Sequence, residues 1–318
     1  MRAFTRRDFF TATAAATAGL ALAARGQQQG GGVVPQEGRF RLCLNTGTIR
    51  GYKLPLEKQI DLATASGYAG IEPWMSDIAE AAKTSGTLRN LATRSKDTGL
   101  TIVSAIGFAP WAVNDPDARA KGLEQMKRDM AMLAELGGTH IAAAPAGING
   151  DYPAVDCDTL AERYRTVLEL GRSMGIIPQL EFWGASTNLS RLEQSLHVAA
   201  QADHPDACVL ADAFHMYKGG SSFNALRLLG RAALHCFHLN DYPADPPRAA
   251  IRDADRIWPG DGIAPLGTVL AAFRDNRADV WLSLELFNQE YWKNPAEETA
   301  KTGLEKMKKV VAGVIEKG

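Results

Sequence analysis

From residue 40 onward, short apolar runs alternate with longer helical segments, and this alternation is the feature that most restricts the fold. The runs are rich in apolar and β-branched residues and lie at 40–46, 70–73, 101–108, 139–145, 176–182, 207–214, 234–240 and 280–287. The segments between them, such as 55–67, 87–99 and 118–137, have helical patterns, and several end at Gly, which suits the left-handed cap of a helix. Eight strand–helix units over about 275 residues predict one (β/α)₈ TIM barrel of the α/β class.

The main competing architecture is a doubly wound open sheet, which also alternates strands and helices. Nucleotide-binding sheets of this kind carry a Gly-rich fingerprint after the first strand. Here the corresponding segment is CLNTGTIRG at 43–51, which contains neither a GxGxxG motif nor a P-loop. The barrel is therefore the predicted fold.

The first residues have the pattern of an export signal. Arg6 and Arg7 stand within TRRDFF, and a weakly apolar, Ala-rich stretch follows, as in twin-arginine signal peptides. We predict a signal peptide at 1–24, a flexible linker at 25–38 and the barrel at 39–318, with export to the periplasm. The alternative is a disordered basic tail. The stretch is too short and too polar for a transmembrane span, so we expect no membrane attachment once the signal is removed.

Composition and charge restrict the class of partner. The chain has 318 residues, of which 46% are hydrophobic and 22% charged, and its formal net charge is −1. Because no basic block follows the first residues, nothing indicates a nucleic-acid backbone as partner. We predict a small-molecule partner, and the sequence is compatible with a homo-oligomer.

Side chains that can bind metals stand at the ends of the last four apolar runs. They are Glu181, Asp212, His238 and Glu285. Each alone could be a hydrogen-bonded rim residue, but the carboxyl ends of barrel strands meet at one rim, where three inward carboxylates repel each other without a cation. Three carboxylates and one imidazole make an oxygen-rich site for a divalent ion. Mn²⁺ is the ion we predict, with Mg²⁺, Co²⁺ or Zn²⁺ as alternatives.

The combined pattern resembles the xylose-isomerase-like TIM barrels, which include sugar phosphate isomerases and ketose epimerases. The resemblance covers about residues 40–315 and is strongest in 177–290. It rests on a Glu after strand five, Asp-x-x-His after strand six, His after strand seven and Glu after strand eight; these are Glu181, Asp212 with His215, His238 and Glu285. The resemblance implies that this set binds one divalent metal and that the two glutamates also act as acid and base.

Two departures from the family pattern narrow the range of possible substrates. Ketose 3-epimerases carry a second Glu six residues after the strand-five Glu and an Arg six residues after the ligand His, where this chain has Thr187 and Ala244. This difference argues against an ordinary free ketose. The AP endonuclease branch uses extra histidines for three zinc ions, and the corresponding segments GIEPW, SAIGFAP and DADRIWPGDG contain none, which argues against chemistry on DNA.

Further residues follow the strand ends and are predicted to contact the substrate. His215 should donate a hydrogen bond to, or accept one from, a substrate oxygen. Trp111 and Trp183, like Trp74, could stack on a sugar face, with rim packing as the alternative. Glu72 could bind a substrate hydroxyl or orient a metal ligand.

These residues together predict a divalent-metal-dependent isomerase or epimerase of an unphosphorylated keto sugar. The metal would stabilise the enediolate formed when the proton next to the carbonyl leaves. The runner-up is β-elimination from a 3-keto glycoside, or dehydration, on the same metal site. A periplasmic sugar-binding protein is the non-catalytic alternative, although the chain shows no mid-chain break between two lobes.

Overall fold

The computed structural model describes residues 40–315, so the signal peptide predicted at 1–24 and the linker predicted at 25–38 lie outside the described residues. The described strands are β1 Phe40–Asn45, β2 Gly70–Glu72, β3 Thr101–Ile102, β4 His140–Ala143, β5 Ile177–Glu181, β6 Val209–Asp212, β7 Leu234–Leu239 and β8 Val280–Leu284.

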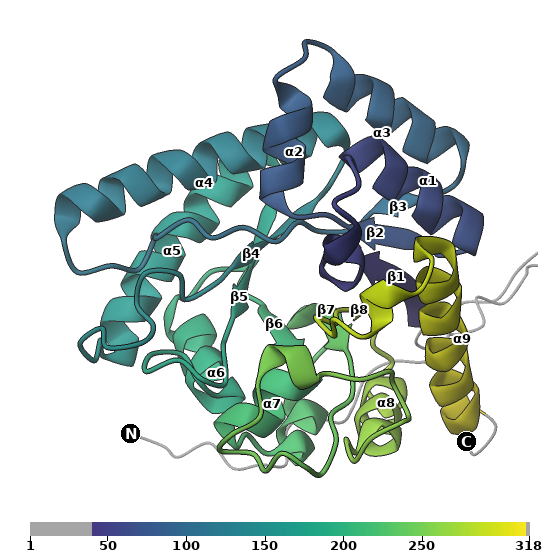
Figure 1. Cartoon of the computed structure of the whole chain (residues 1–318). Coiled ribbons are helices and arrows are strands. Elements are labelled where there is room, and N and C mark those ends of the chain that lie inside the picture. Colours follow the sequence, from purple (N-terminus) through teal and green to yellow (C-terminus); the bar gives the residue numbers. More distant parts are fainter. Residues whose placement is uncertain (1–39, 316–318) are drawn as a thin grey trace, which may run out of the picture. The chain divides into compact units, whose positions relative to one another are not determined.

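The eight strands form one parallel sheet in the order β3-β2-β1-β8-β7-β6-β5-β4. A further parallel bridge joins Ala105, just after β3, to Ile141 in β4. There the Ala105 N–H donates to the His140 carbonyl at 3.1 Å, and the Ala142 N–H donates to the Ala105 carbonyl at 2.9 Å. This bridge connects the two edges of the sheet, so the predicted (β/α)₈ barrel is confirmed (Figure 1).

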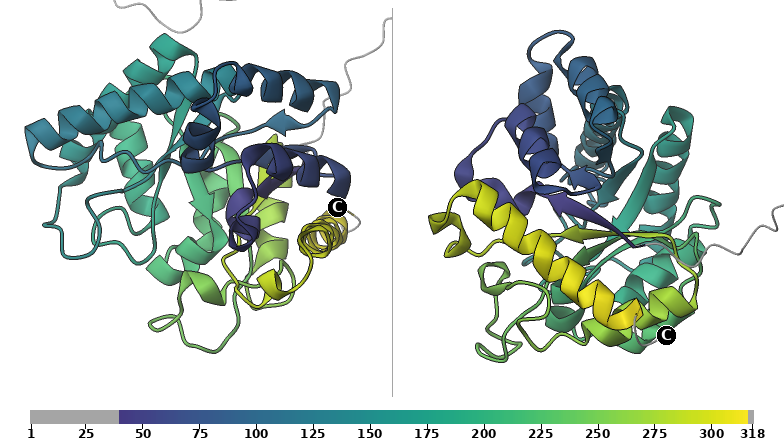
Figure 2. Two further views of the ribbon diagram at one scale, coloured as in Figure 1. Left: turned by 45° about the horizontal axis from the view of Figure 1, so that its top comes forward. Right: turned by 90° about the vertical axis from the view of Figure 1, so that its right-hand side faces the viewer.

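Helices surround the strands, and the C-terminal helix α9 packs beside α1 and α8 (Figures 1 and 2). The α-helices are α1 Leu56–Ser66, α2 Met75–Ala82, α3 Thr87–Asp97, α4 Pro116–Leu136, α5 Cys157–Met174, α6 Leu192–Gln201, α7 Ala213–Gly219, α8 Leu266–Asp275 and α9 Ala296–Ile315. Short 3₁₀ segments are η1 Thr46–Tyr52, η2 Phe223–Leu228, η3 Asp253–Asp255 and η4 Tyr291–Lys293.

Helix α4, the longest within residues 40–315, shows how local sequence sets the helix ends. The Asp115 side chain accepts the Ala118 N–H at 2.7 Å, and Pro116 fills the first helical position, where its missing N–H costs nothing. The helix ends at Gly137, whose φ of 88° is the left-handed conformation that glycine adopts without strain. The Gly that closes the predicted helical run is therefore the observed cap.

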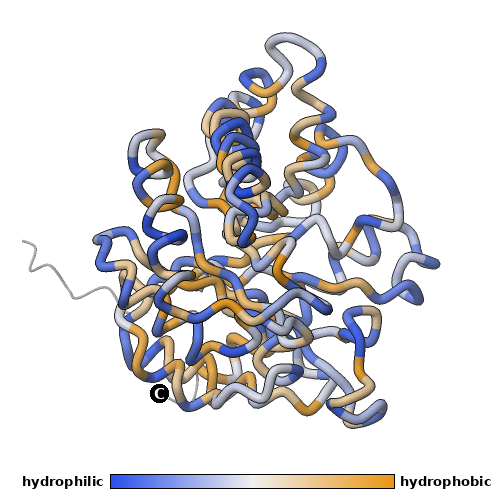
Figure 3. The backbone as a smooth tube through the Cα atoms, turned by 90° about the vertical axis from the view of Figure 1, so that its left-hand side faces the viewer, coloured by the Kyte–Doolittle hydropathy of each residue, from blue (hydrophilic) through white to orange (hydrophobic). Residues whose placement is uncertain are grey.

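The hydrophobic core lies inside the barrel and between the barrel and its helices. The inner cluster consists of Cys43, Val103, Ile106, Ala142, Leu210, Cys236 and Trp281. Hydrophobic and hydrophilic residues alternate along the helices, as expected for elements with one face on a core (Figure 3). No helix between residues 40 and 315 combines the length and apolar character needed to cross a membrane.

Strand lengths differ most from prediction at β3. The apolar run at 101–108 predicts a long strand, but regular pairing covers only Thr101–Ile102, and two isolated bridges, at Ala105 and Ile106, follow. The chain beyond Ile106 leaves the sheet and runs across the rim. This path decides the position of the residues that follow the third apolar run.

Candidate active site

Strand register brings three of the four predicted metal ligands together. Asp212 in β6 pairs with His238 in β7, and His238 pairs with Ser283 in β8, two residues before Glu285. Candidate ligand atoms of Asp212, His238 and Glu285 all lie within 4.8 Å of one another. The three side chains are buried at the carboxyl end of their strands, which is where barrel enzymes place their chemistry.

Asp212 ends β6 and also caps the helix that follows. Its Oδ1 accepts the His215 N–H at 2.9 Å, so the carboxylate starts α7 and places His215 on the first turn. Its Oδ2 accepts a hydrogen bond from Asn240 Nδ2 at 3.1 Å. The DAFH sequence at 212–215 therefore combines a helix cap with two site residues.

The imidazole of His238 is held in one orientation from below. Glu72, at the end of β2, accepts the Nε2–H of His238 at 3.0 Å, and Asn45 and Ser283 donate to the same carboxylate. Burial alone would raise the pKa of Glu72, but these partners, His238 first, hold it below its usual value, so the carboxylate is an acceptor. Nδ1 of His238 consequently points toward Glu285 Oε2 at 3.2 Å and Asp212 Oδ2 at 3.5 Å.

Glu181 ends β5 on the same rim and is buried. Its Oε2 has no hydrogen-bond partner within residues 40–315. Burial raises the pKa of Glu181 to about 8, and the Glu285 and Asp212 carboxylates act in the same direction. The four residues predicted from the strand ends thus share one buried, electrostatically coupled site.

Arg256 is the main site residue that the sequence did not indicate. It lies on the loop between β7 and α8, is 1% exposed, and donates from Nη1 to Asp212 Oδ2 at 2.7 Å and to Glu285 Oε2 at 3.0 Å. Its Nη2 donates to Asp253 Oδ1 at 2.6 Å and lies 3.2 Å from His215 Nε2. A fixed positive charge therefore borders the acidic cluster.

The loop at 240–265 that carries Arg256 is anchored by Asp241. The Oδ2 of Asp241 accepts the N–H groups of Gly260 and Gly262 at 2.9 and 3.1 Å. A Cβ at Gly262 would overlap the Asp241 carboxylate, so only glycine permits this close approach. The PGDG turn and the Asp after β7 therefore set the path of the loop.

The charged groups shift one another's pKa values in opposite directions. Burial alone would raise the pKa of Asp212, but Arg256 and His215 hold it well below its usual value. Burial alone would lower the pKa of His238, but the Glu285 and Glu72 carboxylates hold it well above its usual value. Burial keeps the pKa of His215 below its usual value, so His215 is neutral at neutral pH. Such opposed shifts in one cleft are typical of acid–base sites.

Above these groups lies a cavity of about 430 Å³, here called the central cavity, within the size range of small-molecule sites. Glu181, His215, Arg256 and Glu285 are among its polar lining residues. Its aromatic lining residues form a continuous wall in which Trp74 lies 5.0 Å from Phe108 and 6.0 Å from Phe287, and Phe108 lies 6.0 Å from Trp183. Phe108 is 40% exposed although it is apolar, as expected for a wall that faces a ligand.

The remaining predicted site residues divide between the central cavity and other positions. Trp183 and His215 line the cavity, whereas Glu72 is buried beneath it and contacts His238, which matches the orienting alternative. Trp111 does not line the cavity: it is 0% exposed, its indole N–H donates to the Ala144 carbonyl at 2.8 Å, and its ring packs near Tyr164. Trp111 is therefore corrected to a core residue: the chain has left the sheet after Ile106, and the indole packs inward against Tyr164 instead of facing the cavity.

The donor set fits a divalent cation. Nδ1 of His238 is buried without a hydrogen-bond partner in the described residues, and it faces two carboxylates from neighbouring strands. The group of Asp212, His238 and Glu285 offers one nitrogen and two oxygen ligands, a combination that Mn²⁺, Zn²⁺ and similar ions accept. Glu181 is not in that group, but its buried Oε2 is unpartnered in the described residues and could supply a third oxygen.

Comparisons with known proteins agree with this fold. A family model described as xylose isomerase-like TIM barrel matches residues 60–310. The inosose isomerase of Bacillus velezensis is 24% identical over 275 residues, which is 86% of this chain and 98% of that protein. The 3-dehydroshikimate dehydratase of Pseudomonas putida is 24% identical over 254 residues, which is 78% of this chain and 39% of that protein. A crystal structure of the IolI protein with a bound zinc atom superposes with a TM-score of 0.79 at 23% identity, covering 86% of this chain and 99% of that one.

Proposed function

This chain belongs to the xylose isomerase-like TIM barrel family, and we propose that it is a metal-dependent isomerase or epimerase of a small, unphosphorylated keto sugar or keto cyclitol. The observation that carries the proposal is the convergence of Glu181, Asp212, His238 and Glu285 beneath one ligand-sized cavity. The inosose isomerase among its relatives supports the substrate class, since an inosose is a polyhydroxylated ring with a carbonyl group.

Asp212, His238, Glu285 and Glu181 would hold the metal. A divalent ion there would place positive charge beside the substrate carbonyl and acidify the neighbouring C–H group. The zinc atom in the related IolI structure supports a divalent ion in general, and Mn²⁺ stays our prediction for the ion.

The two glutamates are suited to opposite proton-transfer roles. Glu181, with a pKa near 8, holds a proton at neutral pH until a cation displaces it; the residue lines the cavity, and its buried Oε2 has no hydrogen-bond partner in the described residues. Glu285 lines the same cavity as a hydrogen-bond acceptor from Arg256. One carboxyl group can remove the proton next to a carbonyl while the other returns it. Return to the same carbon gives an epimer, and return to the neighbouring carbon gives an isomer.

Arg256 and His215 complete the polar side of the cavity. The guanidinium can donate to the substrate oxygen on which negative charge develops, and the neutral His215 can exchange a hydrogen bond with a hydroxyl group. The aromatic wall of Trp74, Phe108 and Trp183 suits the apolar face of a sugar or cyclitol ring.

A second candidate is elimination of water or of a glycosidic leaving group. Its first step is the same proton abstraction, and the relationship to a 3-dehydroshikimate dehydratase favours it as the runner-up. Arg256 would also suit the carboxylate of such a substrate.

Proton exchange in D₂O separates these outcomes. The Mn²⁺-loaded protein is incubated with 2-keto-myo-inositol, with a 3-keto glucoside and with 3-dehydroshikimate, and the products are followed by NMR. We expect deuterium at the carbon next to the carbonyl, with an isomer or epimer as product and an eliminated product if the runner-up holds. Glu181→Gln and Glu285→Gln should abolish exchange, while Glu80→Gln on the exposed face of α2 serves as the control. Formation of an isomer or epimer without deuterium incorporation, or simple hydrolysis of a candidate that shows no exchange, would contradict proton abstraction.

A further inference from the structure

The charged residues that line the central cavity differ in how far a ligand can reach them. Glu181 and Glu285 are each 4% exposed, and Arg256 is 1% exposed, so these three are set back from solvent. The side chain of Asp253, in contrast, is 56% exposed. Among the described residues that line the central cavity, Asp253 is therefore the charged group most accessible to an entering ligand.

The guanidinium of Arg256 is fully engaged by protein acceptors. Its Nη1 donates to Asp212 Oδ2 at 2.7 Å and to Glu285 Oε2 at 3.0 Å. Its Nε and Nη2 donate to Asp253 Oδ1 at 3.2 and 2.6 Å, and Nη2 also lies 3.2 Å from His215 Nε2. Three carboxylates thus surround one positive charge. A substrate oxygen can receive a hydrogen bond from Arg256 only by sharing or replacing one of these acceptors.

Asp253 keeps one carboxylate oxygen open. Both bonds from Arg256 end on Oδ1, and Oδ2 accepts no hydrogen bond from residues 40–315. An exposed aspartate beside a guanidinium is ionised at neutral pH. Because Arg256 fixes the carboxylate, the open oxygen is a positioned acceptor for a substrate hydroxyl group. A neutral polyol can use this acceptor, whereas a substrate carboxylate or phosphate must displace Asp253 before it can reach Arg256.

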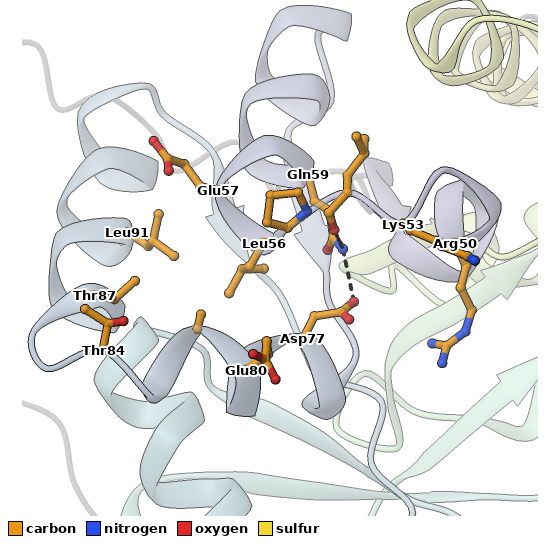
Figure 4. Close-up of a pocket in the computed structure, with 13 residues that line it drawn as sticks. Arg50, Lys53, Leu56, Glu57, Gln59, Asp77, Glu80, Thr84, Thr87 and Leu91 are labelled. Atoms are coloured by element: carbon orange, nitrogen blue, oxygen red, sulfur yellow. Dashed lines mark hydrogen bonds between the residues drawn. The ribbon is translucent and has the colours of Figure 1, made fainter.

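No second positive side chain among the described lining residues balances Asp253. The guanidinium of Arg50 lies 4.0 Å from the ring centroid of Trp74 but does not line the central cavity. Arg50 lines instead the cavity between η1, α1, α2 and α3, as Figure 4 shows. The other accessible polar residues of the central cavity, Asn149 and Ser186, are neutral, and aromatic rings present faces of negative partial charge. Apart from a bound metal, the lining offers an anion no uncompensated positive charge.

We propose that Asp253 is a specificity-determining residue, which selects neutral, hydroxyl-bearing substrates and excludes carboxylates and phosphate esters. The inference rests on the proposed function only in taking the central cavity as the substrate site. It bears on the choice between the two candidate reactions, because a keto sugar or keto cyclitol is neutral whereas 3-dehydroshikimate carries a carboxylate.

The test compares two ring polyols that differ in charge: myo-inositol, which is neutral, and quinate, which carries a carboxylate. Binding to the Mn²⁺-loaded protein is followed by the fluorescence of Trp74 and Trp183, which line the central cavity. Asp253→Asn removes the charge and keeps an oxygen for Arg256, and Asp253→Glu restores the charge. Asp255→Asn is the matched control, because Asp255 lies two positions away and does not line the cavity. A carboxylate that contacts the metal does so in every variant, so differences between variants report on position 253.

We expect Asp253→Asn to bind quinate about tenfold more tightly and myo-inositol about tenfold more weakly than the unmodified protein does. Asp253→Glu and Asp255→Asn should retain the preference for myo-inositol. Because Asp253 is exposed, the variants should fold, which thermal unfolding checks, and Asp253→Ser is a second way to remove the charge.

An unchanged ratio of the two affinities in Asp253→Asn would overturn the proposal. So would the absence of saturable quinate binding by that variant, or an equal change of the ratio in Asp255→Asn. If a keto substrate is turned over but Asp253→Asn leaves the ratio unchanged, the proposed reaction stands and this inference does not. If the ratio changes as expected but no keto substrate is turned over, the inference stands and the proposed reaction does not.

Discussion

Replacing Glu72 by Gln tests whether the buried carboxylate tunes the metal ligand above it. Three of its four hydrogen bonds end on the same oxygen, since Oε2 accepts from Ser283 at 2.7 Å, Asn45 at 2.9 Å and His238 at 3.0 Å. A glutamine whose amide oxygen takes that place keeps all three bonds. The fourth bond, which Cys236 Sγ donates to Oε1 at 3.9 Å, is weak, and the NH₂ group that replaces Oε1 can donate to that sulfur in its place. The substitution therefore removes the charge and leaves the geometry.

The expected effect on metal affinity follows from that difference. Hydrogen bonds to an ionised acceptor are roughly twice as strong as neutral ones, so His238 becomes a weaker electron donor at Nδ1. Loss of a partner that orients a metal-bound histidine typically costs about 10–100-fold in affinity. Because Glu72→Gln keeps the orientation, we expect the lower end, about tenfold, which is about 1.4 kcal/mol. Glu72→Ala, which also loses the orientation, should approach the upper end.

The assay is competition for Zn²⁺ between the protein and a chromogenic chelator. Glu80→Gln, on the exposed face of α2, is the matched control for removing one negative charge and should bind as the unmodified protein does. Thermal unfolding of the metal-free variants shows whether the fold is intact. If Glu72→Gln is folded and binds Zn²⁺ with unchanged affinity, the contact between Glu72 and His238 does not tune the metal, and the reasoning fails.

Three further predictions concern other parts of the chain. Metal binding should release protons, because Glu181, with its pKa of about 8, and His238 must each lose a proton to become ligands. Metal affinity should therefore rise with pH, and the part of this rise that comes from Glu181 should level off above about pH 8. Calorimetry in buffers of different ionisation enthalpy measures the released protons, and finding none would refute this prediction. Asp129 is 7% exposed with an Oδ2 that is unpartnered in the described residues, and burial raises the pKa of its carboxyl group to about 6. Between about pH 4 and 6 the folded state therefore binds more protons than the unfolded state, so the free energy of unfolding falls as pH rises through that window. Asp129→Asn should add about 1–2 kcal/mol of unfolding free energy at pH 8, after allowance for solvent screening, and little at pH 4, whereas an equal effect at both pH values in urea unfolding would disprove the ionisation argument. Replacing both Arg6 and Arg7 by Lys should leave the protein unprocessed in the cytoplasm, and normal cleavage and export of that variant, seen by cell fractionation, would rule out the twin-arginine signal.

The barrel could be predicted because each strand carries its own signal. The apolar runs mark strands buried on both faces, and the Gly residues that end the helices mark the return to the next strand. Strand β3 was overestimated because an apolar run such as 101–108 reports burial and not pairing. Trp111 was misplaced for the same reason: its position after the run suggested the rim, while the chain had already left the sheet at Ile106.

Arg256 could not be predicted because its position depends on the path of a long loop. It lies eighteen positions after His238, and no periodicity reports where such a segment runs. Its contacts depend on Asp241, which gathers the N–H groups of the PGDG turn. The sequence does contain Asp241 just after a predicted strand, and the two glycines of the PGDG turn close to Arg256. That these residues act together becomes evident only in the structure, where the turn closes on the Asp241 carboxylate.

The role of Glu72 shows what strand order adds to a correct assignment of residues. The sequence places Glu72 at a strand end, as it does Glu181 and Glu285, and from that pattern alone all three could reach the substrate. In the barrel, β2 is only three residues long, and Glu72 pairs with Asn45 at the end of β1, so its carboxylate lies beneath His238 and not beside it. Depth inside a barrel depends on the stagger between strands, and stagger is a property of pairing that no single strand encodes. Of the three glutamates, two therefore face the cavity, and the third acts on the chemistry only through the imidazole that it holds.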